Sequence, residues 1–246
     1  METLKRNLQT LIFVAFIVVS AIAGWSIPWF HEWSGTQQSH RSPLIFRSGV
    51  ALTAVGIAVC FLLPGLLVSR QTSESDKQHP IRFRFTINRV VVIVALMVIW
   101  MGTASSPELA ARRFLCASLF CYAAWLMLLN PAARLAAITL FSCMLLPYLW
   151  MALDHAPDRS LMQLLEMPSM ILGSGFPAFV PQLLIGVVID QRTVDWYWLG
   201  ALLTAVQMRV GFWMIQHGPE RTIAILVYSL LASLFGSFFL YEGMRV

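Results

Sequence analysis

Long apolar stretches separated by short polar segments make up almost the whole chain. A helix needs about 17 residues or more to cross the hydrocarbon core of a bilayer. Membrane strands would alternate apolar and polar positions, whereas these stretches are apolar on every face. The pattern predicts an all-α, polytopic integral membrane bundle of about eight transmembrane helices in a single domain, residues 1–246. The predicted spans are 11–30, 48–68, 90–106, 112–129, 135–153, 169–189, 196–215 and 222–241.

Two parts of this assignment allow more than one interpretation: the first stretch, and the third and fourth stretches together. Lys5, Arg6 and the apolar run that ends at Ala21–Ala23 resemble a cleavable secretory signal. Because the apolar stretch continues to Phe30, we expect an uncleaved first helix. The third and fourth stretches are short and are separated only by 107–111, so an antiparallel hairpin is the simplest interpretation.

Composition excludes the water-soluble classes of protein. Apolar residues make up 58% of the chain, charged residues 12%, and the mean hydropathy is +0.72. Soluble chains carry about 25% charged residues. A water-soluble enzyme or a nucleic-acid binder is therefore excluded, and the net charge of +5 is interpreted as a topology bias rather than a nucleic-acid contact.

The distribution of basic residues predicts the orientation. With the N-terminus inside, ten Lys and Arg residues fall on the cytoplasmic side and six on the opposite side. Trp25, Trp29 and Trp33 recur every four residues at the predicted outer end of the first helix, as in an interfacial aromatic belt. Both termini are expected in the cytoplasm, and the membrane is expected to be a bacterial inner membrane.

The sequence gives little support for cofactor binding, metal binding or catalysis. All four cysteines lie in apolar spans, where packing is the simplest role. The clusters His31–Glu32 and 154–158 lack metal-ligand spacing, so solvated loop residues are expected there. No Asp, Glu or His lies in the middle of a span, which argues against acid–base catalysis within the membrane. No metal or cofactor is expected.

The stretch 169–189 contains the first candidate site. Gly173, Gly175, Pro177 and Pro181 fall within nine residues and predict a broken helix. At membrane depth, broken backbone is tolerated where it is buried in protein or lines a cavity. Its free backbone groups then face a substrate or ion. Ser174, Gly175 and Pro177 are therefore candidate substrate- or ion-binding residues.

Residues 173–177 resemble a glycine-serine-glycine-x-proline segment of chloride channels and transporters. In that family a serine and helix N-termini hold the anion. The resemblance covers five residues of 246, and no kinship is inferred from it.

The stretch 196–215 supplies the second candidate site, Gln207 and Arg209. An arginine near the bilayer centre usually faces a partner or a cavity. At ~1.5 Å per residue, Arg209 lies ~20 Å above Trp196, and Pro177 ~18 Å above Ile189. We expect them at similar depth. Three interpretations remain open: a substrate site in a transport path, a contact with another subunit, and simple snorkelling of Arg209 to the outer interface.

Two loops carry further expectations. The cytoplasmic loop 69–89 alternates apolar and polar residues near its end, so Arg82 and Arg84 are candidate contacts to anionic lipid or to a cytoplasmic partner. Outside, residues 158–167 predict a short interfacial helix ended by Pro168.

Together these features favour a non-enzymatic membrane component. The expected function is a small permease, or the membrane subunit of a multiprotein transport or envelope complex. The alternative is a membrane-embedded or surface enzyme of lipid or envelope chemistry. Expected partners are the lipid bilayer and other membrane or cytoplasmic subunits, with no nucleic acid.

Overall fold

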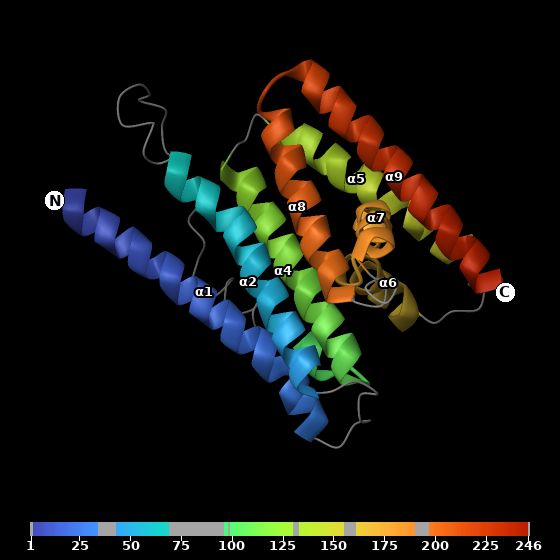
Figure 1. Ribbon diagram of the computed structural model, residues 1–246, viewed down its shortest axis with the longest axis horizontal. Helices are drawn as coiled ribbons and strands as arrows, with labels where there is room; N and C mark the ends of the chain where they lie inside the picture. Colours follow the sequence, from blue (N-terminus) through green and yellow to red (C-terminus); the bar gives the residue numbers. More distant parts are fainter. Residues whose placement is uncertain are drawn as a thin grey trace.

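The fold is known from a computed structural model that describes residues 2–33, 43–68, 96–97, 99–129, 133–154, 161–189 and 197–245. Within these residues the backbone forms helices and turns, with no strand. Figure 1 shows the labelled helices. They are α1 (Glu2–Trp33), α2 (Pro43–Val68), α4 (Pro107–Leu129), α5 (Arg134–Asp154), α6 (Leu161–Gly173), η2 (Phe176–Ala178), α7 (Phe179–Ile189), α8 (Tyr197–Ile215) and α9 (Pro219–Arg245).

Helix length and surface composition fit a membrane protein. Within the described part, five segments are long and apolar enough to cross a membrane: Phe13–Phe30, Leu44–Phe61, Glu166–Ile185, Trp198–Ile215 and Pro219–Phe239. Many large apolar side chains point outward from these helices and from α5. A water-soluble monomer rarely exposes such extended apolar surface. The all-helical class, with helices able to span a membrane, is therefore confirmed.

Close backbone contacts hold α1, α2 and α4 together. Gly24 of α1 lies so near α2 that a Cβ on it would come 2.9 Å from the Cα of Ala51. The Tyr122 ring of α4 stacks on Phe61 of α2, with 5.5 Å between ring centroids. The Tyr122 hydroxyl also lies 3.4 Å from the hydroxyl of Ser20 on α1. Small residues let the helices approach, and the aromatic ring then fills the space between them.

Helix α8 runs in the same direction as α2. Gly49, near the start of α2, contacts Trp198 near the start of α8, and Gly56, two turns further along α2, contacts Leu202, one turn further along α8. The Thr53 hydroxyl donates a hydrogen bond of 3.1 Å to the Trp198 carbonyl. Eight alternating crossings would make the second and seventh spans antiparallel. The parallel course of α2 and α8 does not fit eight alternating crossings.

The same holds for α5 and α9, which are also parallel. The Ser233 hydroxyl of α9 donates to the Met144 carbonyl of α5 at 3.3 Å. One turn further along both helices, Gly236 contacts the Tyr148 hydroxyl. An eight-crossing chain would have its fifth and eighth spans antiparallel.

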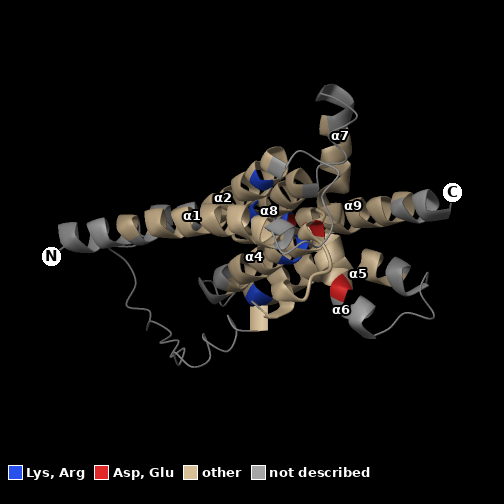
Figure 2. Cartoon of the chain, turned by 90° about the horizontal axis from the view of Figure 1, so that it is seen from below, with Lys and Arg blue, Asp and Glu red and all other residues tan. Residues whose placement is uncertain are grey.

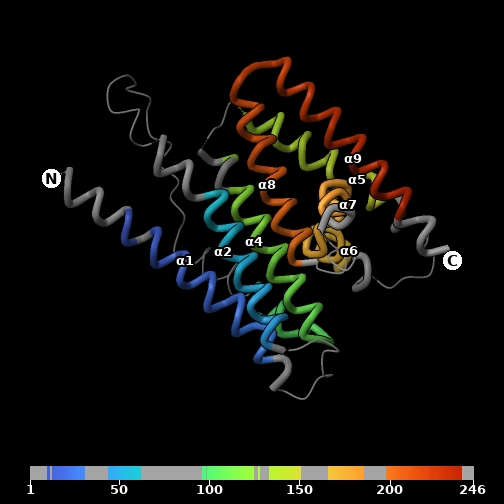
Figure 3. The backbone as a smooth tube through the Cα atoms, viewed as in Figure 1, coloured from blue at the N-terminus to red at the C-terminus, as the bar shows by residue number. Residues whose placement is uncertain are grey.

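The segment between α5 and α8 explains both departures. Along α6, Glu166 pairs with Arg113, and Gly173 contacts the carbonyl of Arg112, so α6 lies across the first turns of α4. Helix α7 is seen end-on in Figure 3 and projects away from the other helices in Figure 2. The predicted sixth span therefore does not run alongside the other helices. The segment α6–η2–α7, which we call the re-entrant segment, contacts α4 and α8 close to their first turns.

Pro168 does not end the helix that precedes it, contrary to expectation. Helix α6 continues through it to Gly173. A proline in a helix removes one backbone donor, but it does not always end the helix. Next to this proline, the Ser169 hydroxyl donates to the Glu166 carbonyl at 2.6 Å, and the Cys116 thiol of α4 donates to the Pro168 carbonyl at 3.5 Å.

The two ends of the chain lie at opposite ends of the molecule (Figure 1). Helix α1 starts at the end where α2, α4 and α8 finish, whereas α9 finishes at the end where those three helices start. Several expectations lie outside the described residues: the loop 69–89 with Arg82 and Arg84, the first part of the span 90–106, and the outer residues 155–160.

Candidate functional site

The helix break expected in the sixth stretch is present. Helix α6 ends at Gly173, and Gly175 adopts a left-handed conformation with φ of 74°. The Gly175 amide donates to the Leu172 carbonyl at 3.0 Å, which closes the last turn of α6. A single 3-10 turn containing Pro177 then leads into α7. Glycine adopts positive φ without steric cost, and proline fixes the turn that follows.

Backbone packs directly on backbone at this break. A Cβ on Gly173 would lie 2.2 Å from the carbonyl oxygen of Arg112 in α4. A Cβ on Gly175 would lie 1.9 Å from the carbonyl carbon of Gly200 in α8. No side chain fits at either position, so the glycines fix where the re-entrant segment meets α4 and α8.

Tyr148 of α5 holds the other side of the break. Its hydroxyl donates a 2.6 Å hydrogen bond to the carbonyl of Phe176, and the two rings stack with centroids 6.1 Å apart. The same hydroxyl fills the space over Gly236 of α9, where a Cβ would lie 2.1 Å away. The 3-10 turn is therefore held between α8, at Gly200, and α9, at Gly236.

Five buried polar side chains lie at this turn and on the faces of α8 and α9 that contact the turn or each other. We call this set the polar column; its members come from the re-entrant segment, α8 and α9. They are Ser174, Thr204, Gln207, Ser229 and Ser233. Thr204 and Ser233 donate to backbone carbonyls of Gly200 and Met144.

The other three members have polar atoms without a partner. The Ser174 hydroxyl, the Ser229 hydroxyl and both amide atoms of Gln207 are buried and form no hydrogen bond among the described residues. Leaving a buried polar group unpaired costs about 1–3 kcal/mol. Proteins usually satisfy such groups with ordered water or ligand.

The register of the α8–α9 hairpin brings two of these residues to the same level. Gly211 of α8 contacts Ile225 of α9 near the turn that joins the helices. Gln207 and Ser229 lie one helical turn further from that contact, on the same faces. Gln207 is ten residues from the start of α8, or ~15 Å along the axis, about halfway through a ~30 Å core.

Arg209 does not join this set. Arg209 is two positions after Gln207, and each position turns an α-helix by about 100°. The two side chains are therefore about 200° apart, and Arg209 faces away from Gln207. It is half-buried and lies within electrostatic range of Cys60 on α2. Among the described residues it forms no hydrogen bond and no ion pair. The structure thus brings Ser174, Gly175 and Pro177 to the α8–α9 side, together with Gln207, and leaves Arg209 on another face.

The expected match in depth between Pro177 and Arg209 is wrong. Gly175, two residues before Pro177, contacts Gly200, and Arg209 lies nine residues further along α8, or about 13 Å. The left-handed turn redirects the chain, so counting residues back from the end of the stretch did not measure depth.

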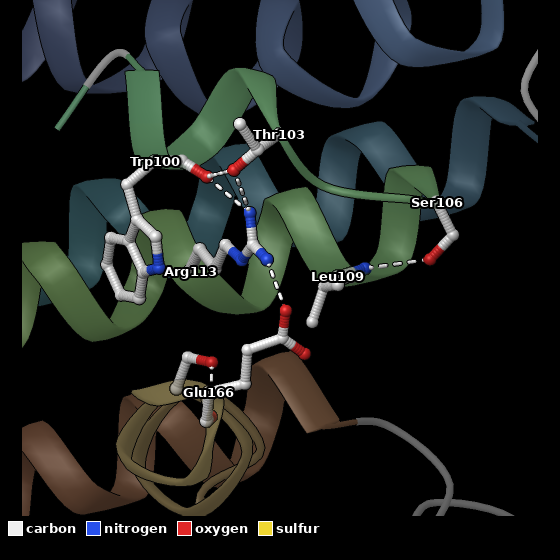
Figure 4. A network of polar contacts seen from close by, with 7 residues as sticks. Trp100, Thr103, Ser106, Leu109, Arg113 and Glu166 are labelled. Carbon is white, nitrogen blue, oxygen red and sulfur yellow. Dashed lines mark hydrogen bonds and ion pairs between the residues drawn. The ribbon is translucent and has the colours of Figure 1, made fainter. Parts of the chain in front are cut away.

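Sequence reasoning missed a buried ion pair that anchors the re-entrant segment (Figure 4). The Arg113 guanidinium of α4 donates at 2.6 Å to the Glu166 carboxylate of α6. It also donates to the Trp100 carbonyl and, at 3.0 Å, to the Thr103 hydroxyl, and it lies over the Trp100 indole ring. The Arg113 side chain is 4% exposed and the Glu166 side chain 32%. The pair ties α6 to α4 and to the residues before α4.

A signal for part of this site was present in the sequence. Ser229, Ser233 and Ser237 recur every four residues, so they mark one face of α9, with Gly236 beside them. That face is buried in the structure. The Arg113–Glu166 pair had no such signal, because the two residues are distant in sequence and fall in separate predicted elements, the span 112–129 and the interfacial helix 158–167.

Within the described residues, no three His, Cys, Asp or Glu side chains gather as a metal site would require. Helix α7 carries no charged residue, and the charged residues of α1 lie within two turns of its ends. No model of a protein family, no curated protein and no solved structure matches this chain.

Proposed function

We propose that the chain is a small permease of a bacterial inner membrane, in which the polar column forms part of the path of a polar solute. The observation that carries the proposal is the set of buried, unpartnered groups of Ser174, Gln207 and Ser229. They come from three elements and extend from the break toward the bilayer midplane. Discontinuous helices and midplane polar groups are the usual parts of transporter sites.

The helix directions support a specific topology for this permease. Helices α2 and α8 are parallel, as are α5 and α9, and the re-entrant segment contacts α4 and α8 close to their first turns. The chain then crosses the membrane seven times, with the segment 161–189 entering and leaving on one side. With the N-terminus in the cytoplasm, the C-terminus is outside.

Thiol labelling tests whether the column is open to water. Gln207→Cys and Ser229→Cys are made after replacing the four native cysteines by alanine. Both variants should react in intact cells with a small water-soluble methanethiosulfonate reagent. Ala205→Cys is the matched control, since Ala205 is fully buried on the opposite face of α8.

The control should stay unlabelled, because packed side chains surround it. If residues 207 and 229 are as unreactive as residue 205, the column carries no water and the permease proposal fails.

Arg209 supports a second candidate function, that of a membrane subunit in a larger complex. A half-buried arginine in an apolar helix is costly unless it meets an acidic group or carbonyl. Such a group would come from another subunit. Native mass spectrometry of the tagged chain, purified in mild detergent, should then show stoichiometric partner proteins that Arg209→Leu releases. A lone chain or homo-oligomer would exclude this alternative.

A further inference from the structure

We infer that the polar column takes small uncharged solutes rich in hydrogen-bonding groups, such as polyols or urea, and not ions. This inference rests on the proposed function and adds the substrate class to it. It depends on which chemical groups the column offers and on where the nearby charges lie.

The members of the column are all neutral. Ser174, Thr204, Ser229 and Ser233 offer hydroxyl groups, and Gln207 offers an amide. A hydroxyl both donates and accepts a hydrogen bond, and the amide has two donors and an acceptor oxygen. A solute with hydroxyl or amide groups can pair with all of them without leaving a buried polar atom unpaired.

Among the described residues, the Arg113 and Arg209 charges are paired or turned away, and the Arg112 guanidinium of α4 donates to the Met170 sulfur of α6 at 3.6 Å. The Arg113 charge is paired with Glu166 at the edge of the re-entrant segment. Arg209 lies on the opposite face of α8 from Gln207. An ion in the middle of the bilayer needs an opposite charge or several converging dipoles to offset its lost hydration. Hydroxyl and amide side chains supply no such opposite charge.

Gln207 is the residue that should discriminate most strongly between solutes. Both its amide atoms are buried and unpaired, so a solute at this level can bond to each of them. Pore selectivity in other membrane proteins depends on the same matching of lining donors and acceptors.

Flux into proteoliposomes tests the inference. The full chain is reconstituted, and the uptake of glycerol and urea is followed by stopped-flow light scattering, with K⁺ and Cl⁻ fluxes followed by a potential-sensitive dye. We expect glycerol or urea uptake at least tenfold faster than in protein-free liposomes, with no ion flux above that background.

Gln207→Leu should bring uptake down to the protein-free rate, whereas Val206→Leu on the exposed face of α8 should leave it unchanged. If both Gln207→Leu and Val206→Leu take up solute at the rate of the unmodified protein, the inference is overturned. A K⁺ or Cl⁻ flux through the unmodified protein would also overturn it. Absence of glycerol and urea uptake would overturn it too. Labelling at residues 207 and 229 decides the permease proposal separately, so the two failures are distinguishable.

Discussion

Gly175 carries two constraints that a single methyl group would violate. Its φ of 74° is disfavoured for any residue with a Cβ, and a Cβ would overlap the backbone of Gly200. The left-handed conformation costs roughly 1–2 kcal/mol, and overpacking adds roughly 1–3 kcal/mol. At the residue scale, this glycine decides whether the re-entrant segment can pack against α8.

Gly175→Ala should therefore destabilise the protein by at least about 2 kcal/mol, because strain and overlap act together. The measurement is the midpoint of thermal unfolding in detergent, followed by tryptophan fluorescence. Gly102→Ala is the matched control, since a Cβ at Gly102 meets no atom within 4 Å. Equal midpoints for the two variants would show that the glycine contact at the break is not tight.

Several site residues could be identified from the sequence because their chemistry is local. Gly175 and Pro177 predict a broken helix from residue type alone, and Gln207 is conspicuous as an amide in an apolar stretch. Which face each residue occupies was harder to predict. Helical periodicity already separates Gln207 from Arg209, but only the packing of α8 against α2 and α9 shows which face meets which helix.

At the scale of elements, the Arg113–Glu166 pair is the main polar link between α4 and α6. Arg113 is almost fully buried, so removing its partner leaves a charge with fewer bonds. Breaking fully buried pairs costs roughly 3–5 kcal/mol, but Glu166 is one-third exposed and solvent screens it. The expected coupling is therefore smaller.

A double-mutant cycle with Arg113→Gln and Glu166→Gln should give a coupling energy of about 1–2 kcal/mol in thermal unfolding. Glu108→Gln, in the first turn of the same helix α4, should show no coupling to Arg113→Gln. A coupling for Glu166 no larger than that for Glu108 would mean that the pair does not anchor α6.

The elements themselves were largely predictable, whereas their directions were not. The apolar stretches 11–30, 196–215 and 222–241 match α1, α8 and α9 within a few residues at most boundaries. Length and hydropathy identify a helix, but they do not show whether it crosses the bilayer. The stretch 169–189 has spanning length, yet its glycine and proline turn changes the direction of the chain.

At the scale of the whole molecule, the parallel helix pairs change the expected position of the C-terminus. The basic-residue count favours the same side for both ends, whereas the parallel helix pairs favour the opposite sides proposed above. The count of Lys and Arg is a weak indicator of topology here, because the single loop 69–89 carries half of the basic residues assigned to the cytoplasmic side.

Reporter fusions decide between the two topologies. Alkaline phosphatase fused after the last residue should be active, because that enzyme needs the oxidising outer compartment. The same fusion after Leu129, between α4 and α5, should be inactive, and green fluorescent protein should give the reverse pattern. An inactive phosphatase at the C-terminus would mean that this end lies in the cytoplasm, and the chain would then cross the membrane an even number of times.

The close fit of the 3-10 turn between α8 and α9 also bears on biosynthesis. Helix α9 is made after α5 and α8, yet it supplies Ser229 opposite Gln207 and Gly236 opposite the Tyr148 hydroxyl. Until the ribosome has released α9, the faces of α5 and α8 that it covers have only lipid beside them. A nascent chain that stops before Pro219 thus leaves the Gln207 amide on an uncovered face of α8, and quality-control proteases would recognise it as unfinished.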